Sequence, residues 1–240
     1  MKATEATTAV SESHEFASRP ALAEALAARV AAALAEAIRT RGAASIAVSG
    51  GSTPKAFFAN LSTADIDWSK VTVTLVDERA VPPSHERSNQ RLVVTQLLQN
   101  RAAAAGFVPL WSVPMDGARL VDLADAAIGR IGRPFDVVVL GMGLDGHTAS
   151  FFPGGSALAE ATDPAATRSV MSMEAEGAGE PRLTLTLPLL VEAPLLVLHI
   201  EGKDKLQVLT EALGPGPETA LPVRAVLRHA RHPVNIYWAP

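Results

Sequence analysis

Residues 137 to 154 read VVVLGMGLDGHTASFFPG, an apolar run that passes directly into glycines. The apolar run predicts a buried strand, and Gly141, Gly143 and Gly146 predict a tight turn after it. The same glycine spacing is that of a dinucleotide-binding fingerprint, which needs a full helix after the last glycine and an acidic residue about twenty positions on, at the end of a second strand. Here Pro153-Gly154-Gly155 stops any helix within two turns, and LAEATDPAA further on is not a strand end. We therefore reject NAD binding and look for another use of this turn.

Short apolar runs like this one recur along the chain and alternate with helical stretches. The runs lie at 45–49, 71–76, 135–140, 168–173, 182–187, 194–200 and 234–238, and the helical stretches at 20–42, 54–61, 88–100, 120–131 and 203–213. This alternation predicts an α/β fold: a largely parallel sheet with helices on both faces, a Rossmann-like three-layer sandwich. Ligands of such sheets bind outside the carboxyl ends of the strands, so functional residues should follow the apolar runs.

Composition limits the kind of ligand. With 240 residues, 48% of them hydrophobic, the chain can bury a substantial core, and we expect a polar tail over 1–19 and a single domain over 20–240. A net charge of -4 with interspersed signs argues against nucleic acid or membrane as a partner, which leaves a small molecule. The absence of cysteine excludes disulfides, thiolate zinc sites and thiol nucleophiles. No signal peptide or membrane span is evident, so we expect a cytoplasmic protein; oligomeric state stays open, with a monomer favoured.

The first strand ends in SGGSTP, which predicts an anion cradle. Gly50 and Gly51 let the backbone approach an anion, Ser52 and Thr53 add hydroxyl donors, and the following helix start favours a phosphate. The lysine of a P-loop is missing. An ordinary strand-to-helix turn capped by Ser or Thr remains the alternative.

The second strand ends in three charges, Asp77, Glu78 and Arg79. At the carboxyl end of a central strand, Asp77 could accept a hydrogen bond from a sugar hydroxyl or orient a catalytic group, and Arg79 could reach a phosphate. An exposed loop would explain the same charges.

The turn that follows residues 137–140 presents Asp145 and His147, two residues apart. A histidine held on a glycine turn beside a carboxylate is a candidate general base. Two alternatives stay open: His147 as a helix cap and Asp145 as a turn-former.

Cations elsewhere could complete an anion site. Arg182 heads a predicted strand, and Lys203 and Lys205 follow another. Each alone is an ordinary surface charge, but with Arg79 and the cradle they could converge on one dianion. His229 and His232 stand at helical spacing without an accompanying carboxylate or cysteine, so we assign no metal.

Five stretches together identify a family. SGGSTP, VDERAVP followed by SN at 88–89, GMGLDGHTASFFPG, RLTLTLP and GKDK resemble, in order and spacing, the 6-phosphogluconolactonases, from about Pro20 to Trp238. The glucosamine-6-phosphate deaminases of the same larger group share the sheet, the cradle and the Asp-Gly-His turn. They carry a Glu where this chain has Phe152 and tend to read Asp-Glu-Tyr where it has Asp77-Glu78-Arg79, so the resemblance favours the lactonase, with a deaminase-like sugar-phosphate isomerase as the alternative.

The resemblance implies hydrolysis of 6-phospho-D-glucono-1,5-lactone to 6-phosphogluconate in the oxidative pentose phosphate pathway, without cofactor or metal. It implies that His147 is the general base and that Asp145 orients or polarises it. The residues implied around the phosphate or neighbouring hydroxyls are Gly50, Gly51, Ser52, Thr53, Arg79, Arg182 and Lys205.

Overall fold

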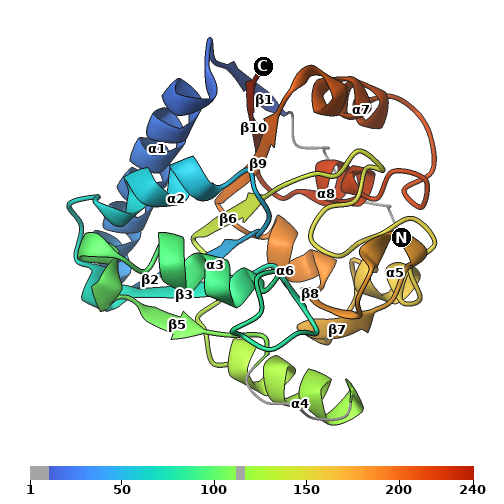
Figure 1. The fold of residues 1–240 in the computed structure, drawn as a ribbon, viewed down its shortest axis with the longest axis horizontal. Helices are drawn as coiled ribbons and strands as arrows, with labels where there is room; N and C mark the ends of the chain where they lie inside the picture. The colour runs from blue at the N-terminus through green and yellow to red at the C-terminus, as the bar shows by residue number, and fades with distance from the viewer. Residues whose placement is uncertain (1–10, 112–116) are drawn as a thin grey trace, which may run out of the picture.

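A computed structural model describes residues 11–111 and 117–240 of the chain (Figure 1). Its main feature is a seven-stranded sheet in which every neighbouring pair is parallel. In spatial order the strands are β1 (Glu12–Glu15), β10 (Val234–Ala239), β9 (Leu195–Glu201), β6 (Val137–Leu140), β2 (Ala44–Val48), β3 (Val71–Leu75) and β5 (Gly106–Val108). The central strands β2 and β6 are buried along their whole length, as their unbroken apolar runs predict.

Eight α-helices accompany the strands in the described residues. They are α1 (Arg19–Arg41), α2 (Lys55–Ser62), α3 (Asn89–Gln96), α4 (Gly117–Ile128), α5 (Leu158–Ala161), α6 (Leu187–Val191), α7 (Lys203–Leu213) and α8 (Val223–His229). The helices α1, α2 and α3 pack against one another in sequence, and α8 packs against α6 and α7. Right-handed crossovers place these two groups on opposite faces of the sheet, so the predicted three-layer α/β fold is confirmed.

Local sequence determines where the long helix α1 begins and ends and which of its faces is buried. Ser18 precedes it in extended conformation and its side chain accepts a hydrogen bond from the N–H of Ala21, while Gly42 ends it with a left-handed φ of 81°. Leu22, Leu26, Val30 and Leu34, spaced by four residues along the helix, are fully buried against the sheet.

A second, three-stranded antiparallel sheet lies beside the main one. Its order is β4 (Asp77–Arg79), β8 (Arg182–Leu185) and β7 (Val170–Met173). The apolar runs at 168–173 and 182–187 therefore form strands as predicted, but outside the parallel sheet. Alternation of side chains identifies a strand but not its partner, which is why the sequence did not reveal this sheet.

Two further short strands also escaped the sequence analysis. The strand β1 lies within the expected polar tail and pairs with β10, while His14 and, just after the strand, Phe16 pack on the ring of Tyr237. The strand β5 has three residues, too few for a periodic signal. Among the described residues, no helix is long and apolar enough to cross a membrane.

The order of the strands locates the binding region. After β2 the chain moves to β3 and then β5, whereas after β6 it moves to β9 and then β10, on the other side. The neighbouring strands β2 and β6 therefore form the switch point of the sheet. The loops that leave these two strands run in opposite directions, which opens a crevice between them. The SGGSTP stretch leaves β2 here, and the glycine turn leaves β6.

Candidate active site

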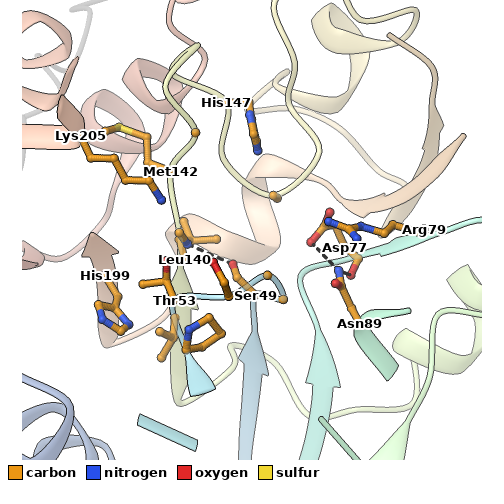
Figure 2. Close-up of a pocket in the computed structure, with 18 of the residues that line it drawn as sticks. Ser49, Thr53, Asp77, Arg79, Asn89, Leu140, Met142, His147, His199 and Lys205 are labelled. Carbon is orange, nitrogen blue, oxygen red and sulfur yellow. Dashed lines mark hydrogen bonds between the residues drawn. The ribbon is translucent and has the colours of Figure 1, made fainter. Parts of the chain in front are cut away.

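A cavity of about 220 Å³ lies at this switch point (Figure 2). All the predicted site residues except Asp145 line it, so the structure brings together segments that are far apart in the chain. In Figure 2, Lys205 reaches the cavity from one side, Asp77 and Arg79 lie on the opposite side, and Ser49 and Thr53 form its base. His147 stands above the base, from the turn after β6.

The cradle after β2 is anchored to the neighbouring strand β6 and keeps free backbone donors. Ser49 fixes it to β6, because its N–H donates to the Val139 carbonyl at 3.0 Å and its hydroxyl accepts from the Gly141 N–H at 3.1 Å. Within residues 11–111 and 117–240, no hydrogen bond engages the N–H groups of Gly51, Ser52 and Thr53. Free N–H groups at the start of α2 can donate to phosphate oxygens, so the geometry favours the cradle over a simple capped turn.

His147 and Asp145 form a hydrogen-bonded pair. His147 Nδ1 lies 2.6 Å from Asp145 Oδ1, and the same carboxylate oxygen accepts the His147 backbone N–H at 3.1 Å. With Nδ1 held by the carboxylate, Nε2 is the ring nitrogen left to accept a proton. Burial acts to raise the pKa of Asp145. The hydrogen bond from His147, the charge of His147 and the backbone N–H groups outweigh burial, so the net effect is a lowered pKa. Asp145 therefore stays ionised beside the imidazole.

Gly143 leaves room for the side chains of His147 and Asp145, which explains a glycine at this position without a pyrophosphate ligand. A Cβ at Gly143 would lie 2.2 Å from His147 Nδ1 and 2.5 Å from Asp145 Oδ1, so no other residue fits beneath the two side chains. The Gly143 N–H also donates to the His147 carbonyl at 2.9 Å and closes the turn. No full helix follows, since the next helix is the four-residue α5, which agrees with the rejection of NAD binding.

Phe152 packs on the imidazole. Its ring centroid is 4.4 Å from that of His147, and the guanidinium carbon of Arg182 lies 5.5 Å from the centroid of the same ring. The residue beside the imidazole is therefore aromatic and carries no carboxylate.

Asp77 is the centre of a buried polar cluster. Its carboxylate accepts from Ser150 Oγ at 2.7 Å and from Asn89 Nδ2 at 3.3 Å, and it lies 3.7 Å from Arg182 Nη1. The antiparallel register of β4 and β8 sets Arg79 opposite Arg182 and so explains why the two cations meet. Burial lowers the pKa of Arg182, and Asp77 counteracts that shift.

The three predicted cations differ in the hydrogen bonds and ion pairs that they make within the protein. Arg79 donates to the Arg87 carbonyl at 3.0 Å, and Arg182 donates to the Ala178 carbonyl at 2.6 Å besides its ion pair with Asp77. Lys205, in the first turn of α7, has no hydrogen bond or ion pair within the part of the chain that the structure describes. Burial lowers its pKa, an effect that the charge of Glu201 opposes. Lys205 is thus the cation most available to a ligand.

Asn89 and His199 are among the lining residues that the predicted site lacked. Asn89, part of the SN pair at the start of α3, ties this helix to Asp77 by donating to its carbonyl at 2.9 Å. His199 lies between Leu198 and Ile200 in β9, is 2% exposed, and its Nε2 lies 3.4 Å from a carboxylate oxygen of Glu201. A buried histidine in an apolar strand was the one available signal for it.

No group of three or more His, Cys, Asp or Glu residues that could hold a metal ion occurs in the described segments. His229 and His232 do not share a helix, because α8 ends at His229. His229 instead lies 3.3 Å from Glu218, a carboxylate that its local sequence does not reveal.

An anion cradle facing a His–Asp pair across a small cavity defines an α/β enzyme for a small phosphorylated ligand. The family model described as glucosamine-6-phosphate isomerases/6-phosphogluconolactonase matches residues 17–238, and the chain belongs to this family. It is 59% identical to a 6-phosphogluconolactonase of Rhizobium meliloti, over 95% of this chain and 98% of that protein. It is 54% identical to one of Mesorhizobium japonicum, over 94% of each chain. A crystal structure of a 6-phosphogluconolactonase from Shewanella baltica superimposes with a TM-score of 0.93 at 39% identity, over 98% of this chain and 100% of that one.

Proposed function

We propose that this protein hydrolyses 6-phospho-D-glucono-1,5-lactone to 6-phosphogluconate. The observation that carries the proposal is that His147, held by Asp145, and the cradle residues Gly51, Ser52 and Thr53 line one cavity of about 220 Å³. The relatives named 6-phosphogluconolactonase support the lactone over the amino sugar as substrate. The deaminase-like alternative has no such support, and Phe152 occupies the place of the carboxylate it would use.

In the proposed mechanism the substrate phosphate binds the N–H groups of Gly51, Ser52 and Thr53, and Lys205 adds a charged donor. This remote anchor orients the ring so that its carbonyl lies below His147. Nε2 of His147 takes a proton from water as the water oxygen bonds to the carbonyl carbon, and the imidazolium that forms is stabilised by Asp145. The same proton then passes to the ring oxygen as the ester bond breaks, which leaves a carboxylic acid that ionises in water, and a free hydroxyl.

Asp77, Arg79 and Arg182 form the other wall of the proposed site. Asp77 already accepts two hydrogen bonds within the protein and pairs with Arg182, so we assign it to holding Arg182 and a substrate hydroxyl and not to proton transfer. Arg79 and Arg182 keep further N–H donors for the substrate's hydroxyls or phosphate.

The test is direct. Purified protein is mixed with freshly made lactone, and 6-phosphogluconate is measured against a blank without enzyme, since the lactone also hydrolyses spontaneously. We expect strong acceleration that persists after treatment with a metal chelator, and no release of ammonia from glucosamine 6-phosphate. A rate equal to the blank would refute the proposal, and loss of activity on chelation would refute its metal-independent form.

Location and assembly remain predictions of the same proposal. We expect activity in the cytoplasmic fraction of the cell and the mass of a monomer in sedimentation. Activity confined to another fraction, or a stable dimer, would contradict them.

A further inference from the structure

Arg224 is a buried arginine that binds only backbone carbonyls. It lies in the first turn of α8 and is 3% exposed. Its Nε donates to the Ala212 carbonyl at 3.3 Å, Nη1 to the Pro217 carbonyl at 3.2 Å, and Nη2 to the carbonyls of Glu211 at 2.8 Å and Pro215 at 3.1 Å. No carboxylate pairs with it within residues 11–111 and 117–240. The guanidinium thus joins the carbonyl end of α7 to the 214–222 loop, where the helix dipole favours a positive charge.

The loop that Arg224 organises leads directly to the catalytic turn. At its end, Leu221 packs on Gly146 so closely that a Cβ there would lie 2.6 Å from Leu221 Cδ2. The Val223 N–H donates to the Gly146 carbonyl at 2.9 Å. Gly146, with a left-handed φ of 74°, is the residue between Asp145 and His147.

Gly146 is linked in turn to Gly143, which lies beneath the catalytic pair. The Gly146 N–H donates to the Gly143 carbonyl at 3.1 Å, and Gly143 lies beneath the side chains of His147 and Asp145. Both side chains of the pair are partly exposed, at 33% for His147 and 43% for Asp145. Their position therefore depends on the backbone of the turn, which Leu221 and Val223 hold from one side.

The same guanidinium also holds the end of α7 opposite Lys205. That helix begins at Lys203, carries Lys205 in its first turn, and ends at the carbonyls bound by Arg224. Figure 1 shows α7 and α8 on the same side of the molecule, joined by the loop at its edge. One buried side chain thus ties the helix that carries the ligand cation to the segment that supports the base.

We propose that Arg224 is a positioning residue: by fixing the 214–222 loop it presses Leu221 and Val223 against Gly146 and holds the Asp145–His147 pair in catalytic geometry. The consequence for catalysis rests on the proposed lactonase function. The consequence for the hydrogen bond between His147 and Asp145 does not, and can be measured without substrate.

The test compares Arg224→Gln with Leu221→Ala. The first removes most of the hydrogen bonds to the carbonyls, and the second removes only the contact at the end of the path. We expect both variants to lower kcat roughly tenfold, because a displaced base loses rate. Leu221→Ala should keep KM within about twofold, since it leaves α7 and Lys205 in place, whereas Arg224→Gln also frees the end of α7 and should raise KM as well. In the proton NMR spectrum, the downfield resonance of the His147 Nδ1 proton should shift upfield or broaden in both. Arg224→Lys, with a single ammonium group, should recover only part of the rate.

The matched control is Ile131→Ala. Ile131 is buried beside Arg133 and Pro134 near the amino end of β6, away from the carboxyl ends that form the site. It should lower the melting temperature but leave kcat and the Nδ1 resonance unchanged, which is the pattern of a purely structural residue.

Each outcome decides the question. If folded Arg224→Gln and Leu221→Ala keep the wild-type kcat and Nδ1 resonance, losing only stability as Ile131→Ala does, the proposal is wrong. If Arg224→Gln does not fold, Leu221→Ala alone decides in the same way. If the wild-type protein lacks lactonase activity, the proposed function fails, and the Nδ1 resonance still tests whether Arg224 positions the pair.

Discussion

His147 can present Nε2 to the cavity because Asp145 holds Nδ1 at 2.6 Å. Replacing His147 by Asn keeps some hydrogen bonding but removes a group that can accept and return a proton. We expect kcat to fall by about 10² to 10⁴, with a smaller change in KM. Initial rates corrected for spontaneous hydrolysis check this, with the melting temperature as a control for folding. A folded variant that keeps more than about a third of the wild-type kcat would show that His147 is not the base.

Because the ammonium of Lys205 is free to bind the substrate, its replacement should change KM and not mainly kcat. Because the phosphate is bound in both the ground state and the transition state, Lys205→Ala should mainly raise KM, by about tenfold or more for the loss of a charged hydrogen bond. Arg182→Ala should raise KM too, but it also leaves the buried Asp77 without its ion pair and should lower stability. Kinetics and melting of both variants separate the two cases. An unchanged KM in both would mean that the anion site is wrongly assigned.

The lowered pKa of Lys205 gives a pH dependence with a defined sign. Burial is the main cause, so the amine loses its proton at a lower pH than a lysine in water. Affinity for 6-phosphogluconate should be fully present below this lowered pKa and fall as the pH rises through it. Calorimetric titration with the stable product measures the fall. Lys205→Arg stays charged and should not show it; an equal fall in that variant would assign the effect to another group.

At the scale of elements, Glu78 joins the strand β4 to the helix α3. Its buried carboxylate accepts the N–H groups of Asn89 at 2.8 Å, Gln90 at 2.7 Å and Arg79 at 2.7 Å. Burial raises the pKa of Glu78, and these N–H groups act against that shift. The side chain thus holds the end of β4, with Asp77 and Arg79, against the start of the helix.

Glu78→Ala should therefore destabilise the protein by several kcal/mol, because each buried donor left without a partner costs about 1–3 kcal/mol. Chemical denaturation measures the free energy of unfolding. Glu86→Ala, an exposed glutamate of the same loop, is the control and should stay within about 0.5 kcal/mol of wild type. Equal stability of the two variants would show that Glu78 does not hold α3.

At the scale of the whole molecule, one continuous sheet and its core predict one folding unit, which covers the expected domain 20–240 and also β1 (Glu12–Glu15). Trp68 lies next to β3 and Trp238 in β10, toward opposite ends of the sheet. Denaturation followed by tryptophan fluorescence and by far-ultraviolet circular dichroism should give a single transition with the same midpoint. Two separated transitions would divide the chain into domains and contradict the prediction.

The sequence alone determined the class of the fold and the segments that form the site. The five predicted helical stretches are helices, and SGGSTP and GLDGH follow strands as predicted, because helical and strand periodicity and turn chemistry depend on neighbours in the chain. Since parallel strands end at one edge of a sheet, even the region of the cavity could be anticipated.

Only the tertiary structure decided which side chains meet and how they are held. Arg79 and Arg182 become neighbours through the antiparallel pairing of β4 and β8, and Asn89 reaches Asp77 because α3 packs against the end of β4. Arg224 looks like one more helix charge in the sequence, yet it is buried on carbonyls of the preceding helix and loop. The formation of such contacts depends on how the elements pack in the whole core, which no local pattern of residues records.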